Sequence, residues 1–328
     1  MAIESIKIEN FTVFQDISCD FSPGINIFIG ENGIGKTHLL KLIYVANIMH
    51  SSGYTLDIRD VFGNSFKTKG CRFIINGDDS YPWTFSLTAH RYEGASLLPV
   101  QSYIHVNTDA KTPAVFIPAK EVLSMSNLTR VDDDYKRTLN LDVTITDIIK
   151  KAQKMIPDII PKLAVKLAQK IENQIGGKVF LDENDNTFWI HKNCGAKIPF
   201  TSEAEGYKKL GLLWQLVMNK SIKEGTILLW DEPEANLNPK LIPVVVDVLM
   251  ELSRNGVQVF LATHEYMFAK YFEVKQQETE AIMFHSLYKT DFGAECESNI
   301  NFRDLKKNDI NDAFDVLMDG VIGKNLGD

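Results

Sequence analysis

Residues 30–37 form the segment that most restricts the possible fold, because Gly-Glu-Asn-Gly-Ile-Gly-Lys-Thr fits the pattern G-x-x-x-x-G-K-[S/T]. A strand-like run in which apolar and polar positions alternate, Ile25 to Ile29, precedes this segment, and residues 37–49 follow it with apolar side chains at a helical spacing. A strand, a glycine-rich loop and a helix in this order can surround phosphate groups, since the glycines let backbone N–H groups turn inwards and the helix N-terminus adds positive potential. The sequence therefore predicts a phosphate-binding loop.

Each residue of this loop has an expected role. Lys36 is expected to reach the terminal phosphates and to act in catalysis, and Thr37 is expected to bind Mg²⁺. One helix terminus contributes only about 0.3 to 2 kcal/mol, so a triphosphate also needs the lysine and the metal ion. The alternative is a glycine-rich turn without a ligand. The predicted nucleotide-binding residues are Gly30, Glu31, Asn32, Gly33, Ile34, Gly35, Lys36, Thr37 and His38.

Two later apolar runs also end in polar side chains. Ile227 to Trp230 is followed by Asp231 and Glu232, and residues 259–262 are followed by Thr263 and His264. Such runs are typical of parallel strands buried on both faces, whose carboxyl ends carry the ligand chemistry of α/β sheets. We expect Asp231 to hold Mg²⁺, directly or through water, Glu232 to polarise the attacking water, and His264 to contact the γ-phosphate or that water. A surface turn at Asp231-Glu232 and a structural role for His264 are the alternatives.

Composition narrows the class of protein. The chain has 328 residues, 45% of them hydrophobic, which suits one large globular domain or two smaller ones. A net charge of −8 disfavours a uniformly basic surface for nucleic acid, so any such contact is expected to be local. No apolar run approaches the roughly 20 residues of a membrane span, and charges at Glu4, Lys7 and Glu9 disfavour a signal peptide. Four dispersed cysteines then suggest reduced thiols and a cytoplasmic location.

The order of strand and helix patterns predicts an α/β fold of the P-loop NTPase type. Residues 1–120 are expected to form the first half of the core, with an antiparallel sheet from residues 61–106 on its flank. Residues 121–200, with Pro157, Pro161 and Gly176-Gly177, are expected to form an inserted, mainly helical lobe. Residues 201–328 are expected to complete the core and to end in Asp-rich helical sequence.

Four segments in order resemble the heads of ABC-type ATPases: residues 28–40, 204–211, 229–239 and 261–265. Within that class the chain resembles the RecF/OLD-like AAA family ATPases, including the PtuA-type subunits of bacterial antiphage systems. The resemblance covers about residues 1–60 and 200–290. It implies an ABC-ATPase-like head with a mixed core sheet. It also implies that two subunits pair head to tail, with ATP and Mg²⁺ between the phosphate loop of one and the signature helix of the other.

The expected signature segment departs from the family pattern. If Gly206 takes the family's glycine, Ala204 stands where a serine usually contacts the neighbour's γ-phosphate, and Ser202 lies two residues too early. The trans contact of Ser202, Ala204, Glu205 and Gly206 is therefore expected to be weakened or remade by backbone N–H groups. A second interpretation is that residues 202–205 form a capping box for a helix from Tyr207 to Asn219, and both can hold together. For the family's metal-binding Q-loop glutamine, Gln101 is the candidate retained.

The inserted lobe is rich in lysine. Residues 150–178 contain seven lysines against two acids, and Lys162, Lys166 and Lys170 recur every four residues on one helical face. A solvated charged face is one explanation. Contact with nucleic acid or an acidic partner is the other.

These features and the resemblance predict an ATP-hydrolysing head that pairs on nucleotide, as a homodimer or a higher even oligomer, and regulates a separately encoded effector in antiphage defence. No second catalytic constellation follows His264 in the sequence, so the effector step is assigned to another chain. The alternative is a DNA-binding repair ATPase of the RecF kind. A transporter subunit is disfavoured because the L-S-G-G-Q signature is missing, and a GTPase because Asn219-Lys-Ser-Ile222 lacks the Asp of N-K-x-D. No membrane contact is expected.

Overall fold

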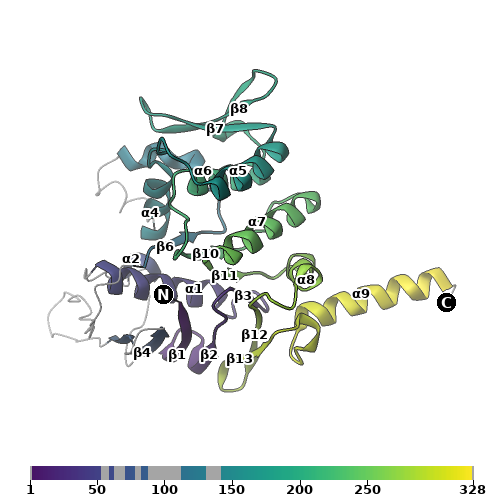
Figure 1. Cartoon of the computed structure of the whole chain (residues 1–328). Helices are drawn as coiled ribbons and strands as arrows, with labels where there is room; N and C mark the ends of the chain where they lie inside the picture. Colours follow the sequence, from purple (N-terminus) through teal and green to yellow (C-terminus); the bar gives the residue numbers. More distant parts are fainter. Residues whose placement is uncertain are drawn as a thin grey trace.

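The structure is a computed structural model of the chain (Figure 1). It describes residues 2–52, 59–62, 71–77, 83–87, 112–130 and 142–326. Its centre is a sheet of six strands in the order β13-β12-β3-β11-β10-β6. The strands are β3 (Ile25–Ile29), β6 (Ala114–Ile117), β10 (Ile227–Asp231), β11 (Gln258–Ala262), β12 (Ile282–Thr290) and β13 (Gly293–Asn299).

The strands of this sheet are parallel except for β13, which pairs antiparallel with β12. Every residue of β3, β10 and β11 is buried, which the nearly uninterrupted apolar runs predicted for β10 and β11. The registers Asp231↔Ala262 and Ala262↔Phe28 bring the carboxyl ends of these three strands to one edge. The α/β fold with a mixed core sheet is thereby confirmed.

Helices cover both faces of the central sheet, and each face has its own apolar core. On one face, Phe28, Leu229 and Phe260 pack with the residues of α1. On the other face, the alternating neighbours Leu228 and Leu261 pack with α6, α7 and α8. The helices are α1 (Lys36–Ser52), α6 (Glu205–Met218), α7 (Ile242–Arg254) and α8 (Tyr266–Lys275).

A second sheet, antiparallel and ordered β2-β1-β4-β5, lies on the flank of the α1 side. It confirms that an antiparallel sheet flanks the core, but two of its four strands come from residues 3–20 and not from 61–106. Strand β2 was not predicted from the sequence, because its buried residues, Phe14, Ile17 and Cys19, do not alternate strictly with polar ones. The elements here are β1 (Ile3–Phe11), β2 (Phe14–Asp20), α2 (Arg59–Phe62), β4 (Cys71–Gly77) and β5 (Trp83–Leu87).

The segment expected as a helical lobe contains helices and also a small sheet. Its helical elements are η1 (Leu123–Arg130), α4 (Val143–Ala152), α5 (Lys162–Ile175) and η2 (Phe200–Ser202). Gly176 ends α5 with a left-handed φ of 66°, and the chain then enters an antiparallel sheet that the sequence analysis did not predict. The strands of that sheet are β7 (Gly177–Asp182), β8 (Thr187–Lys192) and β9 (Lys197–Pro199). Residues Leu167 and Ile171 of α5 belong to the same core as α6 and α7.

The last helix, α9 (Asp309–Leu326), projects from the body of the molecule into solvent (Figure 1). Its first turns pack on the head, where the ring of Phe314 stacks on Tyr266 at 3.9 Å between centroids. Two short turns, η3 (Pro239–Leu241) and η4 (Phe302–Asp304), complete the described elements. Each helix within the described ranges is too short or too polar to cross a membrane.

Candidate active site

The phosphate loop joins β3 to α1 in a conformation that requires glycine. Gly30 has a φ of 140°, and a Cβ there would lie 2.2 Å from the carbonyl oxygen of Leu287. Gly35 has a φ of 104°, and a Cβ there would lie 2.6 Å from the ring of Phe14. Both positions therefore combine a left-handed backbone with a close approach that any side chain would block.

Lys36 points back into the loop that precedes it. Its Nζ donates to the carbonyl oxygens of Gly30 at 2.6 Å and Glu31 at 2.9 Å, and the residue is only 6% exposed. Burial lowers the pKa of Lys36, and the carboxylates of Glu232 and Asp231 oppose that shift. The ammonium group is thus held in the curve of the loop, close to two acids from another strand.

Thr37 and Asp231 meet across the gap between α1 and β10. The Thr37 hydroxyl donates to Oδ2 of Asp231 at 2.8 Å. The other oxygen, Oδ1, is buried without a hydrogen-bond partner among the described residues, and burial raises the pKa of Asp231. A hydroxyl and a desolvated carboxylate with an unused lone pair are oxygen ligands of the kind that Mg²⁺ takes, so these residues fit the metal that the sequence pattern implies.

Glu232 and His264 extend from neighbouring strand ends towards each other. Oε1 of Glu232 lies 3.4 Å from Nδ1 of His264, and both side chains remain partly open to solvent. Glu232 has a left-handed φ of 45°, which is costly for a non-glycine residue. Its backbone N–H donates to the carbonyl oxygen of Ala262 at 2.9 Å and holds that turn in place. A carboxylate and an imidazole in this arrangement can polarise a water molecule.

Glu234 is a third acid at this edge, and no role was predicted for it from the sequence. The Thr263 hydroxyl donates to its Oε1 at 2.6 Å, while Oε2 is buried and lacks a partner in the described structure. Burial raises the pKa of Glu234. The only signal in the sequence was its spacing, two residues beyond Glu232.

Lys209, from α6, is the cation that the sequence analysis missed. Its Nζ donates to the carbonyl oxygen of Glu232 at 2.8 Å, and the residue is 4% exposed. Burial lowers its pKa to about 8, against the pull of Glu234 and Glu232. Lys209 therefore ties the helix that follows the signature segment to the backbone of Glu232.

The signature segment lies at the start of α6. The helix begins at Glu205 with Ala204 as its N-cap, and no side chain caps it. The predicted capping box is therefore wrong, because Ser202 lies in η2 and the helix starts two residues before Tyr207. Gly206 packs closely under Leu237. Within the described part of the chain, no hydrogen bond or ion pair joins residues 202–206 to the phosphate loop.

Two other predicted residues lie apart from this constellation. His38 packs its ring edge-on against Phe62, with centroids 5.6 Å apart, and burial lowers its pKa, so its side chain belongs to the apolar layer under the loop. Gln101 lies outside the described residues.

The amino-acid sequence was compared with the models of known protein families. Residues 25–268 match the model of the AAA_21 family, described as "AAA domain, putative AbiEii toxin, Type IV TA system". The chain belongs to this family. The matched residues include the phosphate loop, the Asp231-Glu232 strand end and His264.

Curated relatives match shorter parts of this AAA_21 chain. It is 25% identical over 172 residues to the DNA double-strand break repair Rad50 ATPase of Methanococcus maripaludis, covering 47% of this chain and 17% of that protein. It is 44% identical over 57 residues to the DNA replication and repair protein RecF of Lysinibacillus sphaericus, covering 17% of this chain and 15% of that protein. The chain thus spans less than a fifth of the length of these two relatives.

Solved structures agree on the fold. An Smc head bound to the C-winged helix domain of ScpA superposes with a TM-score of 0.56 at 12% identity, covering 92% of this chain and 99% of that one. An Smc head with an extended coiled coil, from Pyrococcus furiosus, gives 0.54 at 12% identity, covering 97% and 99%. The AAA_21 chain therefore has the fold of these Smc heads.

Proposed function

We propose that the chain binds and hydrolyses ATP with Mg²⁺, pairs with a second copy on nucleotide, and uses this cycle to regulate a separately encoded effector. The observation that carries the proposal is the meeting of Lys36, Thr37, Asp231, Glu232 and His264 at one sheet edge, with one carboxylate oxygen of Asp231 buried and unpartnered. Unpartnered buried oxygens are costly unless a ligand satisfies them.

Each residue then has a role at the nucleotide. Lys36 and the loop N–H groups bind the phosphates, while Thr37 and Asp231 hold Mg²⁺, which neutralises phosphate charge when bound. Glu232 accepts a proton from the attacking water, and His264 orients that water or contacts the γ-phosphate. Lys209 positions the backbone of Glu232 through its hydrogen bond.

The pairing of two copies rests on the start of α6. Since no side chain caps this helix, the N–H groups of Glu205 and Gly206 have no side-chain acceptor in the described chain. A helix N-terminus of this kind binds anions. We therefore assign the trans contact with the γ-phosphate to backbone groups of residues 204–206, which makes the missing serine unnecessary, and we assign Ser202 a place at the rim of this contact.

The test measures ATP binding, phosphate release and molar mass on the same purified full-length chain. We expect heat of binding with ATP and Mg²⁺, steady release of phosphate, and a doubled mass by light scattering when Glu232→Gln is saturated with ATP. A well-folded chain that gives no heat with ATP and Mg²⁺ would overturn the proposal.

The proposal also includes a role in defence against phage. The family description names a putative toxin of a Type IV toxin–antitoxin system and no effector. The PtuA-type resemblance implies a head that acts on an effector in phage defence. Purification of the chain together with the products of its neighbouring genes, followed by mass determination of the complex, tests it. Recovery of the chain alone under every nucleotide condition would contradict an effector-bound head.

A DNA-binding repair ATPase is the second candidate, and the Rad50 and RecF relatives favour it. It predicts that the chain raises the fluorescence anisotropy of a labelled DNA duplex only when ATP and Mg²⁺ are present. It also predicts that salt weakens this binding, since phosphate contacts release counterions. Equal, weak binding with and without nucleotide would leave the effector hypothesis as the better account.

A further inference from the structure

The distal turns of α9, residues 316–324, carry apolar side chains into solvent. Five of them are 39 to 74% exposed. Because successive residues of a helix lie about 100° apart, these side chains form a broad apolar face, and Asp312, Asp315 and Asp319 occupy the remaining side. A helix that is apolar over so much of its surface is normally buried. The five residues are Val316, Leu317, Met318, Val321 and Ile322.

The residues of the head that the structure describes leave most of this apolar face uncovered. The first turns of α9 are fixed by Ile310 and Phe314, which pack on the head around Tyr266, and the helix then runs outwards (Figure 1). The three acids form no ion pair with any described residue. The distal turns thus present an apolar face with a negative border, and the described residues of the same chain do not cover it.

A groove of about 630 Å³ lies at the opposite edge of the central sheet. Segments that precede β10 and β11, residues 222–224 and 254–257, form one side, and the first turns of α5 form the other. Its floor is apolar, and the buried residues there are Ala164, Leu167, Val217, Ile222, Leu252 and Val257.

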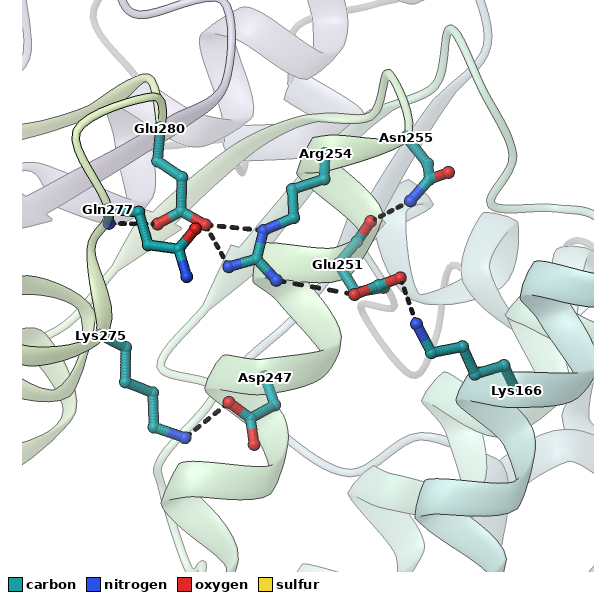
Figure 2. Close-up of polar contacts among 8 residues, drawn as sticks. All are labelled: Lys166, Asp247, Glu251, Arg254, Asn255, Lys275, Gln277 and Glu280. Atoms are coloured by element: carbon teal, nitrogen blue, oxygen red, sulfur yellow. Dashed lines mark hydrogen bonds and ion pairs between the residues drawn. The ribbon is translucent and has the colours of Figure 1, made fainter.

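The rim of this groove is cationic. Lys220 and Lys223 line it and form no ion pair with the described residues, while Glu224 is its one acid. Arg254 also lines it, but its guanidinium is already bound to Glu251 and Glu280 (Figure 2). Two lysines therefore remain to meet negative charge.

We propose that the distal turns of α9 of one copy occupy this groove in a second copy. The broad apolar face of the helix matches the apolar floor, and Lys220 and Lys223 carry the charge opposite to that of its acids. One contact thereby covers two surfaces that the described residues of one chain leave open. Pairing of two α9 helices with each other would leave the groove and its lysines uncovered.

This contact differs from the nucleotide pair. It joins different surfaces of the two copies, so it is heterologous and extends as a ring or a chain. The groove lies at the amino ends of β10 and β11, whereas the nucleotide residues lie at their carboxyl ends. Nucleotide pairs can therefore be joined into larger even assemblies, and the contact itself needs no ATP.

Sedimentation velocity of the full-length chain without nucleotide tests the proposal. We expect wild type to sediment above the single-chain mass at tens of micromolar. The α9 variant Val321→Asp with Ile322→Asp, and the groove variant Lys220→Glu with Lys223→Glu, should each weaken association about tenfold or more. Val274→Asp on α8, where the side chain is 71% exposed, and Lys289→Glu on β12 are matched controls that should sediment like wild type.

A charge exchange adds specificity to the test. Asp315→Lys with Asp319→Lys, combined with the groove variant, should restore the assembly that either pair of changes alone weakens. The same experiment on Lys36→Ala separates this contact from nucleotide pairing, because assembly should persist there. A wild type of single-chain mass, a groove variant that assembles normally, or a charge exchange that restores nothing would each overturn the proposal.

Discussion

The strand-end site and the outer face of α5 use lysine in opposite ways. Lys36 and Lys209 are 6% and 4% exposed and donate to backbone carbonyls beside the acids of β10. On α5, by contrast, Lys162 is exposed, and Lys166 reaches outwards to Glu251 on α7 (Figure 2). Since lysine is rarely buried without a partner, a buried lysine marks a built site, whereas an exposed row is first of all a solvated face.

The variant Lys36→Ala is the strongest test of this difference between buried and exposed lysines. Lys36→Ala removes a buried charge that would face the phosphates, and truncation of such a charge costs about 2–5 kcal/mol, which weakens ATP binding about 30-fold or more and stops hydrolysis. Titration calorimetry with ATP and Mg²⁺ measures it. Lys166→Ala is the matched control and should bind ATP like wild type, so equal losses in both variants would contradict the contrast between the two regions.

Glu232 tests the chemistry rather than the binding. Glu232→Gln keeps the size and polarity of the side chain but removes the base, so phosphate release should fall about 10² to 10⁴-fold while ATP still binds. Light scattering should then show a paired species that persists with ATP. Hydrolysis at the wild-type rate would exclude Glu232 as the base.

Because Lys209 is buried, we expect the free energy of unfolding to depend on pH. Its pKa is about 8 in the folded chain, against an ordinary value of 10.5. Between these values the unfolded chain binds more protons, so the free energy of unfolding rises as pH increases from about 8 to 10.5, by about 3 kcal/mol at most, and the penalty is fully present below 8. Lys209→Met should remove this slope.

Urea unfolding at several pH values measures the effect. The informative quantity is the difference between wild type and Lys209→Met, because other groups titrate equally in both. Parallel curves would show that the Lys209 ammonium is not destabilised by its burial.

The smallest effect is expected on α5. The triple variant Lys162→Glu, Lys166→Glu and Lys170→Glu should change the free energy of unfolding by no more than about 1 kcal/mol, because exposed ion pairs contribute little. Its phosphate release should match wild type. A loss of DNA binding or of effector capture in this variant would show that the lysine face is an interface, and unchanged binding would leave it a solvated surface.

Local patterns predicted the parts of the fold and site that depend on local chemistry. The loop at Gly30 to Thr37 and the strands ending at Asp231 and Ala262 could be read because burial on both faces leaves an uninterrupted apolar run with a polar end. The roles of Glu232 and His264 remain predictions, although the structure places their side chains together.

Features that depend on contacts between distant segments could not be predicted from the sequence. Lys209 lies in a run of two lysines that suits an exposed helix face, and only the packing of α6 on β10 buries it. The capping box failed because η2 takes up Ser202 before the helix begins. Strands β7 to β9 were missed because their short, partly exposed runs follow two helices and resemble loops.

The left-handed backbone of Glu232 lowers the stability of the fold at a residue that is proposed to be needed for ATP hydrolysis. A glycine at this position would adopt the same φ of 45° without the roughly 1 kcal/mol that an L side chain incurs there. Selection for heat resistance alone would therefore favour replacing the very residue on which hydrolysis is proposed to depend. Retention of glutamate after such a selection would mean that its carboxylate also supports the fold.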